Sequence, residues 1–138
     1  KLVDKYYQQG WNLLYPGNTY VQSTGDEKKY EGKPLGEKFP YDLKKFIGKS
    51  YGTLPVTPYD NTFTAEFAKV TITGEKLGAD EITDFLAISF SSPDYIGHTF
   101  GPNSPEAEDG FLRLDKDLES LFDFLDAKVD QDCDYQPQ

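Results

Sequence analysis

Apolar residues recur at intervals of three and four along the last third of the chain, and this spacing predicts one long helix. Its apolar face consists of Phe111, Leu114, Leu118, Leu121, Phe122, Leu125 and Val129. Ser104 is a typical N-cap, and Pro105 suits the first helical position, so the helix is expected from Pro105 to about Lys128. A second helix is predicted over residues 62–77 with Gly78 after its end, although the β-branched residues within it have low helix propensity.

Between these helices, Phe85–Phe90 is a short and nearly continuous apolar run. Such a run predicts a strand buried on both faces, as in a parallel sheet. Residues 91–104 contain two glycines and two prolines and are expected to form a loop. The order helix, strand, loop, helix is a unit of an α/β sheet, and ligand sites in such sheets lie beyond the carboxyl ends of the strands, where this loop lies.

The first 58 residues have a different composition, rich in Tyr, Gly, Pro and Lys. A short helix is predicted over Leu2–Gln9 and should end at Gly10, and Tyr41–Ile47 is expected to form a helical turn. The polar stretch 23–38 is expected to be a surface loop.

Composition restricts the possible partners. The 138 residues are enough for one domain, or for a piece of a larger one, with its own core. There are 24 acidic and 14 basic residues, so the net charge of −10 repels nucleic acid and anionic lipid, and neither is expected as a partner. No run is long enough to span a membrane, and no signal-peptide pattern is visible. The chain begins at Lys1 and contains no methionine, so we expect it to be a piece of a longer protein.

The candidate chemistry lies in residues 91–98, Ser-Ser-Pro-Asp-Tyr-Ile-Gly-His. Asp94 and His98 stand four apart, and a carboxylate with an imidazole suits zinc. The bare Asp-x-x-x-His pattern is weak, because it fits a loop cap and a surface histidine more often than a metal site. His98 is the single histidine and Cys133 the single cysteine, which excludes a multi-cysteine zinc site and an internal disulfide framework.

The residues around this motif favour the metal-site interpretation over the loop cap and the surface histidine. Residues 84–102 closely resemble the alkaline phosphatase superfamily, and most of all the single-threonine periplasmic phosphatases that share a core with nucleotide pyrophosphatases/phosphodiesterases. The resemblance continues through Glu108-Asp109 and residues 112–118, and backwards through residues 67–69 and 74–78. It implies an α/β fold. We therefore expect a fragment of an alkaline-phosphatase-like sheet sandwiched by helices, with an irregular N-terminal half rich in Tyr, Gly and Pro.

The resemblance also implies a function and a site. In that family two zinc ions hold a phosphoryl group, and the matching motif residues here, Asp94 and His98, bind one of them. The threonine nucleophile and the other ligands would lie outside this chain, so no catalytic residue is expected within it. The parent protein is expected to be a zinc-dependent phosphate-ester hydrolase, exported to the periplasm or secreted. The isolated chain is expected to be inactive and, through an unpaired strand edge, to self-associate.

Residues 1–138 are accordingly interpreted as one fragment of a catalytic domain, with a loop-rich segment 1–58, a helix-strand-loop-helix unit 59–129 and an acidic tail 130–138. Two alternatives stay open. One is a phosphodiesterase or nucleotide pyrophosphatase of the same superfamily. The other is a non-catalytic extracellular binding module, which the many tyrosines and the acidic surface would suit if the tyrosines formed an exposed platform rather than a core.

Three weaker signals have ordinary interpretations. Asp130, Asp132 and Asp134 imitate the start of a calcium loop but lack its glycine, so a solvated tail is expected. Cys133 has no nearby base and is expected to have no role in chemistry. Arg113 is expected to form an ion pair with a neighbouring carboxylate.

Overall fold

The computed structural model describes residues 2–24, 35–36 and 38–132. The helices within these ranges are α1 (Asp4–Gln9), α2 (Tyr59–Gly74), α3 (Ser92–Phe100) and α4 (Pro105–Asp132), with short 3₁₀ turns η1 (Gly17–Thr19), η2 (Lys44–Phe46) and η3 (Leu54–Val56). Across those ranges the β-type pairing consists of one isolated antiparallel bridge, between Trp11 and Tyr41.

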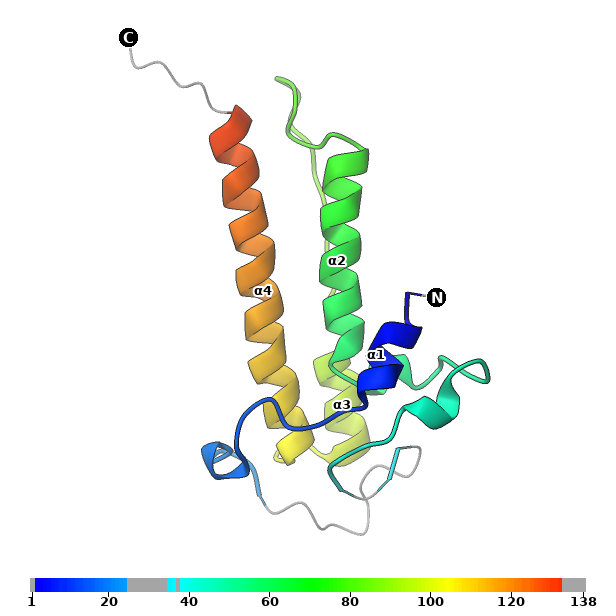
Figure 1. The fold of residues 1–138 in the computed structure, drawn as a ribbon. Helices are drawn as coiled ribbons and strands as arrows, with labels where there is room; N and C mark the ends of the chain where they lie inside the picture. Colours follow the sequence, from blue (N-terminus) through cyan, green and yellow to red (C-terminus); the bar gives the residue numbers. More distant parts are fainter. Residues whose placement is uncertain (1, 25–34, 37, 133–138) are drawn as a thin grey trace.

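The two long helices, α2 and α4, pack side by side and run in the same direction (Figure 1). The predicted start of α4 is confirmed, since the Ser104 hydroxyl accepts a hydrogen bond from the Ala107 amide at 3.1 Å and Pro105 is the first helical residue. The helix predicted over residues 62–77 is confirmed as α2, which begins and ends three residues earlier.

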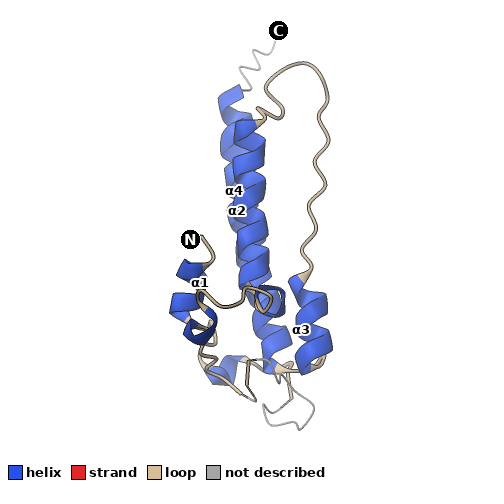
Figure 2. Cartoon of the chain, turned by 90° about the vertical axis from the view of Figure 1, so that its right-hand side faces the viewer, coloured by secondary structure: helices blue, strands red, loops and turns tan. Residues whose placement is uncertain are grey.

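A segment after α2 runs back beside the long helices to the start of α3 (Figure 2). Residues 83–90 of this segment are extended, but no strand pairs with them among the described residues. Phe85 is 92% exposed, and Leu86 and Ile88 line an open groove of roughly 610 Å³ toward Ile72 and Leu125. The prediction of a strand buried on both faces at residues 85–90 is therefore wrong for this chain, and the predicted sheet is not confirmed.

The physical reason is the lack of pairing. A strand needs a neighbouring strand for its N–H and C=O groups, and a buried strand also needs an apolar layer on each face. The described residues offer α2 and α4 and no second strand. The apolar run therefore keeps an extended backbone without forming a sheet.

The predicted loop at residues 91–104 is also wrong over most of its length, because it contains α3. Pro93 lies in the first turn, where its missing N–H costs nothing. Ile96 and Phe100, one turn apart, are both 0% exposed, so burial of this face stabilises the helix. Gly101, at φ 95°, ends it.

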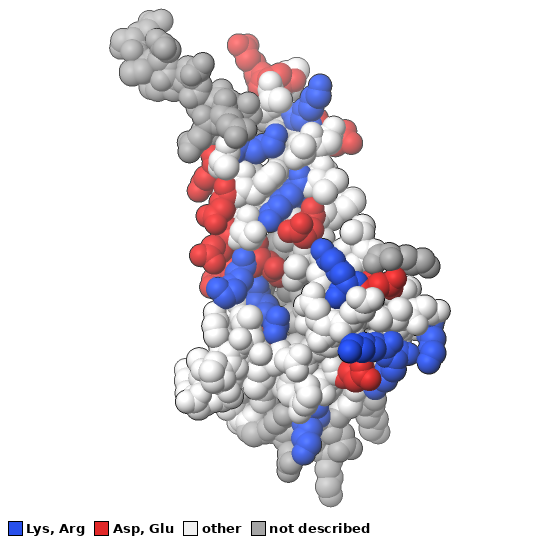
Figure 3. All heavy atoms as spheres, in the orientation of Figure 1, with Lys and Arg blue, Asp and Glu red and all other residues white. Residues whose placement is uncertain are grey.

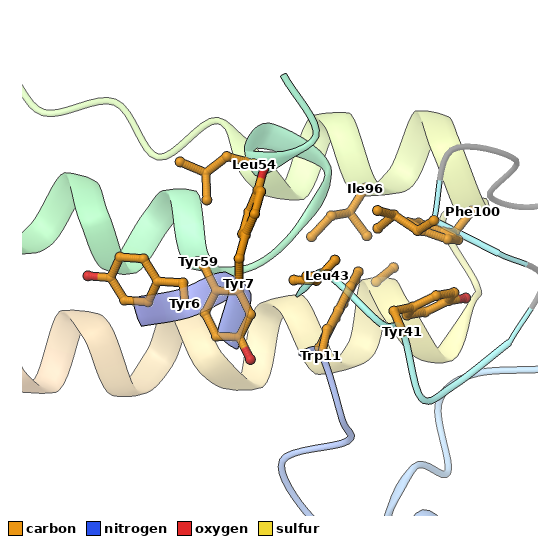
Figure 4. Close-up of a cluster of buried hydrophobic side chains, with 11 residues drawn as sticks. Tyr6, Tyr7, Trp11, Tyr41, Leu43, Leu54, Tyr59, Ile96 and Phe100 are labelled. Carbon is orange, nitrogen blue, oxygen red and sulfur yellow. The ribbon is translucent and has the colours of Figure 1, made fainter. Parts of the chain in front are cut away.

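An aromatic core joins the two halves of the chain (Figure 4). Trp11 is fully buried and meets Phe100 edge-on, with ring centroids 5.8 Å apart. Tyr6 stacks on Tyr59 at 5.5 Å. The buried members are Tyr6, Tyr7, Trp11, Leu35, Tyr41, Leu43, Leu54, Tyr59, Ile96, Phe100 and Ala107. The tyrosines among them build a core rather than a platform, which removes the main support for the binding-module alternative.

Acidic side chains line the outer flank of α4, with lysines interspersed over the helical part of the molecule (Figure 3). None of the helices described here is long and apolar enough to cross a membrane. Most of the predicted surface loop 23–38, and residues 133–138 of the predicted acidic tail with Cys133, lie outside the described residues.

Candidate metal half-site

Asp94 and His98 lie one turn apart on the same face of α3. His98 Nε2 is 3.4 Å from Asp94 Oδ1, and the side chains are 81% and 75% exposed. Residues four apart on a helix project from one face. The opposite face of α3 carries Ile96 and Phe100 into the core, so both polar side chains point outward.

The separation of these two atoms suits zinc. Zinc binds imidazole nitrogen at about 2.0–2.1 Å and carboxylate oxygen at about 2.0–2.2 Å in a tetrahedral arrangement, which puts two ligand atoms about 3.4 Å apart. The distance is therefore compatible with two of the four positions around one ion, and it is also ordinary for an ion pair between residues one helical turn apart. No third His, Cys, Asp or Glu joins them within the described part of the chain, so the pair is at most a candidate half-site.

The half-site opens into a pocket of roughly 340 Å³ whose other walls are apolar. Pro102 and Phe111 contribute to this wall, and Phe111 is 58% exposed. Sequence periodicity assigned Phe111 to the apolar face of α4, but it lies beside His98 at the pocket instead of in the core. This apolar wall limits access of water to Asp94 and His98 from one side.

The position of α3 depends on close packing against α4. Gly110 lies under Ile96, where an added Cβ would stand 3.1 Å from Ile96 Cδ1. Any larger residue at Gly110 would therefore push on the helix that carries the half-site. No sequence pattern indicates this contact, because a glycine within a helix pattern only lowers helix propensity.

A buried carboxylate, Asp109, fixes the N-terminal segment to α4. It is 0% exposed and accepts hydrogen bonds from Trp11 Nε1 at 2.7 Å, the Leu14 amide at 2.7 Å and the Tyr20 hydroxyl at 2.5 Å. Arg113 Nε donates to it at 2.6 Å, which confirms the predicted ion pair. Burial, together with the hydrogen bond to Asp109, raises the pKa of Tyr20 to about 12.

Two further acidic residues of α4 also bind tyrosine or threonine hydroxyls. Glu106 is 0% exposed and accepts from the Tyr41 hydroxyl at 2.5 Å. Asp117 accepts from Thr62 Oγ1 at 3.0 Å, and burial against α2 raises its pKa to about 6. Sequence reasoning missed the two buried carboxylates, Asp109 and Glu106, and the half-buried Asp117. One sequence signal could have identified Asp109, because it stands one helical turn before the chain's single arginine.

Comparison with known proteins gives a consistent set of matches. A model of the family described as Type I phosphodiesterase / nucleotide pyrophosphatase matches residues 4–134. The alkaline phosphatase PhoV of Synechococcus elongatus is 52% identical over 132 residues, which cover 94% of this chain and 24% of PhoV. A protein of Myroides odoratus named calcium-transporting ATPase is 49% identical over 135 residues, with 94% and 25% covered.

A solved structure agrees with these matches. The crystal structure of wild-type alkaline phosphatase PafA matches with a TM-score of 0.86 and 44% identity, over 91% of this chain and 25% of PafA. The chain thus spans about a quarter of the length of the relatives it matches.

Proposed function

Because this chain belongs to the Type I phosphodiesterase / nucleotide pyrophosphatase family, we propose that the whole protein is a zinc-dependent phosphate-ester hydrolase of the alkaline phosphatase type. In this proposal the chain supplies Asp94 and His98 as two ligands of one zinc ion. The observation that carries it is the 3.4 Å separation of Oδ1 and Nε2 on the exposed face of α3. The name of one relative, alkaline phosphatase PhoV, supports it.

Bound zinc would polarise a phosphoryl oxygen and lower the pKa of coordinated water. The chain's own side chains do three things. Asp94 offers a carboxylate oxygen, His98 offers its Nε2, and Phe111 covers one side of the pocket against water.

The remaining parts of the site belong to the rest of the protein in this proposal. A second zinc ion, the nucleophile and further ligands would come from outside the 138 residues, so the isolated chain should not turn over substrate. Residues 1–138 would be one piece of the catalytic domain. In the whole domain residues 83–90 would pair as a strand of the α/β sheet, and the 610 Å³ groove would be filled.

Several finer points are also proposals. The substrate would be a small phosphate ester, with a phosphodiester or nucleotide pyrophosphate as the alternative that the family name favours. The protein would be exported, with no nucleic-acid or membrane partner. Copies of the isolated chain would self-associate through the exposed extended segment.

A chimera tests the enzyme proposal. The 138 residues would replace the matching quarter of alkaline phosphatase PafA, and zinc-dependent release of nitrophenol from p-nitrophenyl phosphate would be measured. We expect the chimera to be active, and Asp94→Asn and His98→Ala each to lower its activity at least 100-fold. The matched control is Asp126→Asn, which changes an exposed carboxylate at the far end of α4 and should leave the activity unchanged. Equal activity in all four chimeras would refute the assignment.

A further inference from the structure

We propose that Asn61, on α2, is a positioning residue for the helix that carries Asp94 and His98. Its side chain caps the start of α3 from a neighbouring element. The residue before α3, Ser91, makes no side-chain capping bond. Asn61 Oδ1 instead accepts a hydrogen bond from the Ser92 amide, the first of the helix, at 3.3 Å. The link to metal binding rests on the proposed function, whereas the capping role does not.

Burial makes this bond matter. Asn61 is 1% exposed and Ser92 is 0% exposed, so the Ser92 amide cannot turn to bulk water if its acceptor is removed. The next residue, Pro93, has no N–H to be satisfied. The Asn61 carboxamide therefore supplies the acceptor for the first backbone donor of α3.

The two ends of α3 are held by different contacts. Ile96 and Phe100 are buried in the core, and the helix packs against α4 and η3, which fixes its middle and end. Asp94 lies in the first turn, two residues after the capped amide, whereas His98 lies in the last turn. Loss of the cap would therefore loosen Asp94 relative to His98 and disturb their 3.4 Å separation.

Packing alone does not explain an asparagine at position 61. Asn61 Nδ2 is buried and has no hydrogen-bond partner among the described residues. The Ser92 hydroxyl interacts with the neighbouring carboxyl of Asp60, which lowers the pKa of Asp60, although burial raises it by more. Buried polar atoms without partners destabilise a fold, so an apolar residue would pack at lower cost. What asparagine adds is the acceptor for the Ser92 amide.

Three variants separate capping from packing. Asn61→Leu keeps a side chain of similar size but removes the acceptor, Asn61→Asp keeps an oxygen acceptor, and Thr64→Val changes a partly buried residue one turn along the same helix. Two measurements are made on the full 138-residue chain. The first is backbone hydrogen exchange along α3, resolved by NMR. The second is the affinity for zinc alone, by calorimetry.

We expect Asn61→Leu to speed exchange of the amides at 94–96 about five- to tenfold relative to those at 98–100, as loss of a helix cap does. Its zinc affinity should fall about tenfold, the usual effect of disturbing groups that orient metal ligands. Asn61→Asp keeps the acceptor but buries a charge that lowers overall stability, so only its ratio of exchange between the two ends of α3 should stay within about threefold of the parent. Thr64→Val should match the parent in both measurements.

The proposal is overturned if exchange in Asn61→Leu rises uniformly along α3 or not at all, or if Asn61→Asp behaves like Asn61→Leu. A purely structural residue would lower overall stability without changing the ratio between the two ends of the helix. If the parent chain binds no zinc through His98, the proposed function loses its half-site, but the exchange ratio still decides whether Asn61 caps α3.

Discussion

Replacing Asp109 with asparagine tests whether one buried carboxylate joins the N-terminal segment to α4. The side chain is 0% exposed and accepts four hydrogen bonds, from Trp11, Leu14, Tyr20 and Arg113. An amide offers one oxygen in place of two, and its NH₂ group would face donors.

At least two of the four hydrogen bonds would be lost, each worth about 1.5–3 kcal/mol because the acceptor is charged. The partner guanidinium would also lose its counter-ion, and breaking a buried pair costs about 3–5 kcal/mol. The two figures overlap, so we expect Asp109→Asn to lower the free energy of unfolding by about 3–5 kcal/mol. That is a large share of the stability of a domain this size.

The assay is urea unfolding at neutral pH, followed by the fluorescence of Trp11, the single tryptophan and a direct partner of Asp109. With a slope near 1.5 kcal/mol per M, the midpoint should fall by about 2–3 M. Tyr20→Phe removes one donor and should cost about 1–2 kcal/mol. Glu108→Gln is the same change on a neighbouring, half-buried residue that accepts two backbone amides, one exposed and one partly buried, and it should cost less than about 1 kcal/mol. A loss of stability in Asp109→Asn no larger than in Glu108→Gln would show that the buried carboxylate does not join the N-terminal segment to α4.

Three other predictions concern stability and association. Gly10 has φ +67°, and an added Cβ would lie 2.9 Å from the Tyr41 carbonyl oxygen, so Gly10→Ala should lower the free energy of unfolding by about 2–4 kcal/mol. Gly48 has φ +73° but open space around it, so Gly48→Ala should lower it by only about 1–2 kcal/mol. Equal losses in thermal or urea unfolding would contradict the steric argument. The pKa of Asp117 is raised from its ordinary value of 3.8 to about 6, so the protonated form favours the fold below about pH 4 and this contribution is lost as the pH rises through 6. Asp117→Asn should therefore raise the free energy of unfolding by about 1–2 kcal/mol at pH 7.5, after allowance for solvent screening, and leave it unchanged at pH 3.5. The same dependence of stability on pH in the variant and the parent would refute this. Phe85 is 92% exposed, so Phe85→Ser should change the free energy of unfolding by less than about 0.5 kcal/mol. The variant should also self-associate less in analytical ultracentrifugation. A large loss of stability would contradict the exposed position of Phe85.

The long helices could be predicted because their signals are local. Periodic apolar residues, Ser104 as a cap and Pro105 at the first position are enough to define the start of α4. The short helix at the N-terminus and its end at Gly10 follow for the same reason. The resemblance to the alkaline phosphatase superfamily is confirmed by the family match over residues 4–134.

The errors at residues 85–104 have a common cause. The apolar run 85–90 has the composition of a buried strand, but pairing depends on partners that no local pattern supplies, and here it stays extended. The helix α3 was missed because Pro93 and Gly97 resemble loop residues, whereas burial of Ile96 and Phe100 in an aromatic core decides its structure. That core brings together Trp11, Tyr41 and Phe100, which lie far apart in sequence.

The sequence singles out the pair Asp94 and His98 but does not predict its geometry. Asp94 and His98 were expected on a loop, where a turn would have had to bring them together. The helix places them on one face directly, 3.4 Å apart. Their assignment as zinc ligands stays a prediction. The residues that support them, Asn61 and Gly110, lie on other helices, and contacts between helices leave no local pattern for sequence reasoning to find.

The most direct test of the account is a calorimetric zinc titration of the chain, of Asp94→Asn and His98→Ala, and of Asp126→Asn as a control. We expect weak binding of one zinc ion by the parent chain and by Asp126→Asn, at pH 7.5. In each of the two ligand variants the affinity should fall at least tenfold. Zinc binding of equal strength in all four proteins would contradict the assignment of Asp94 and His98 as metal ligands.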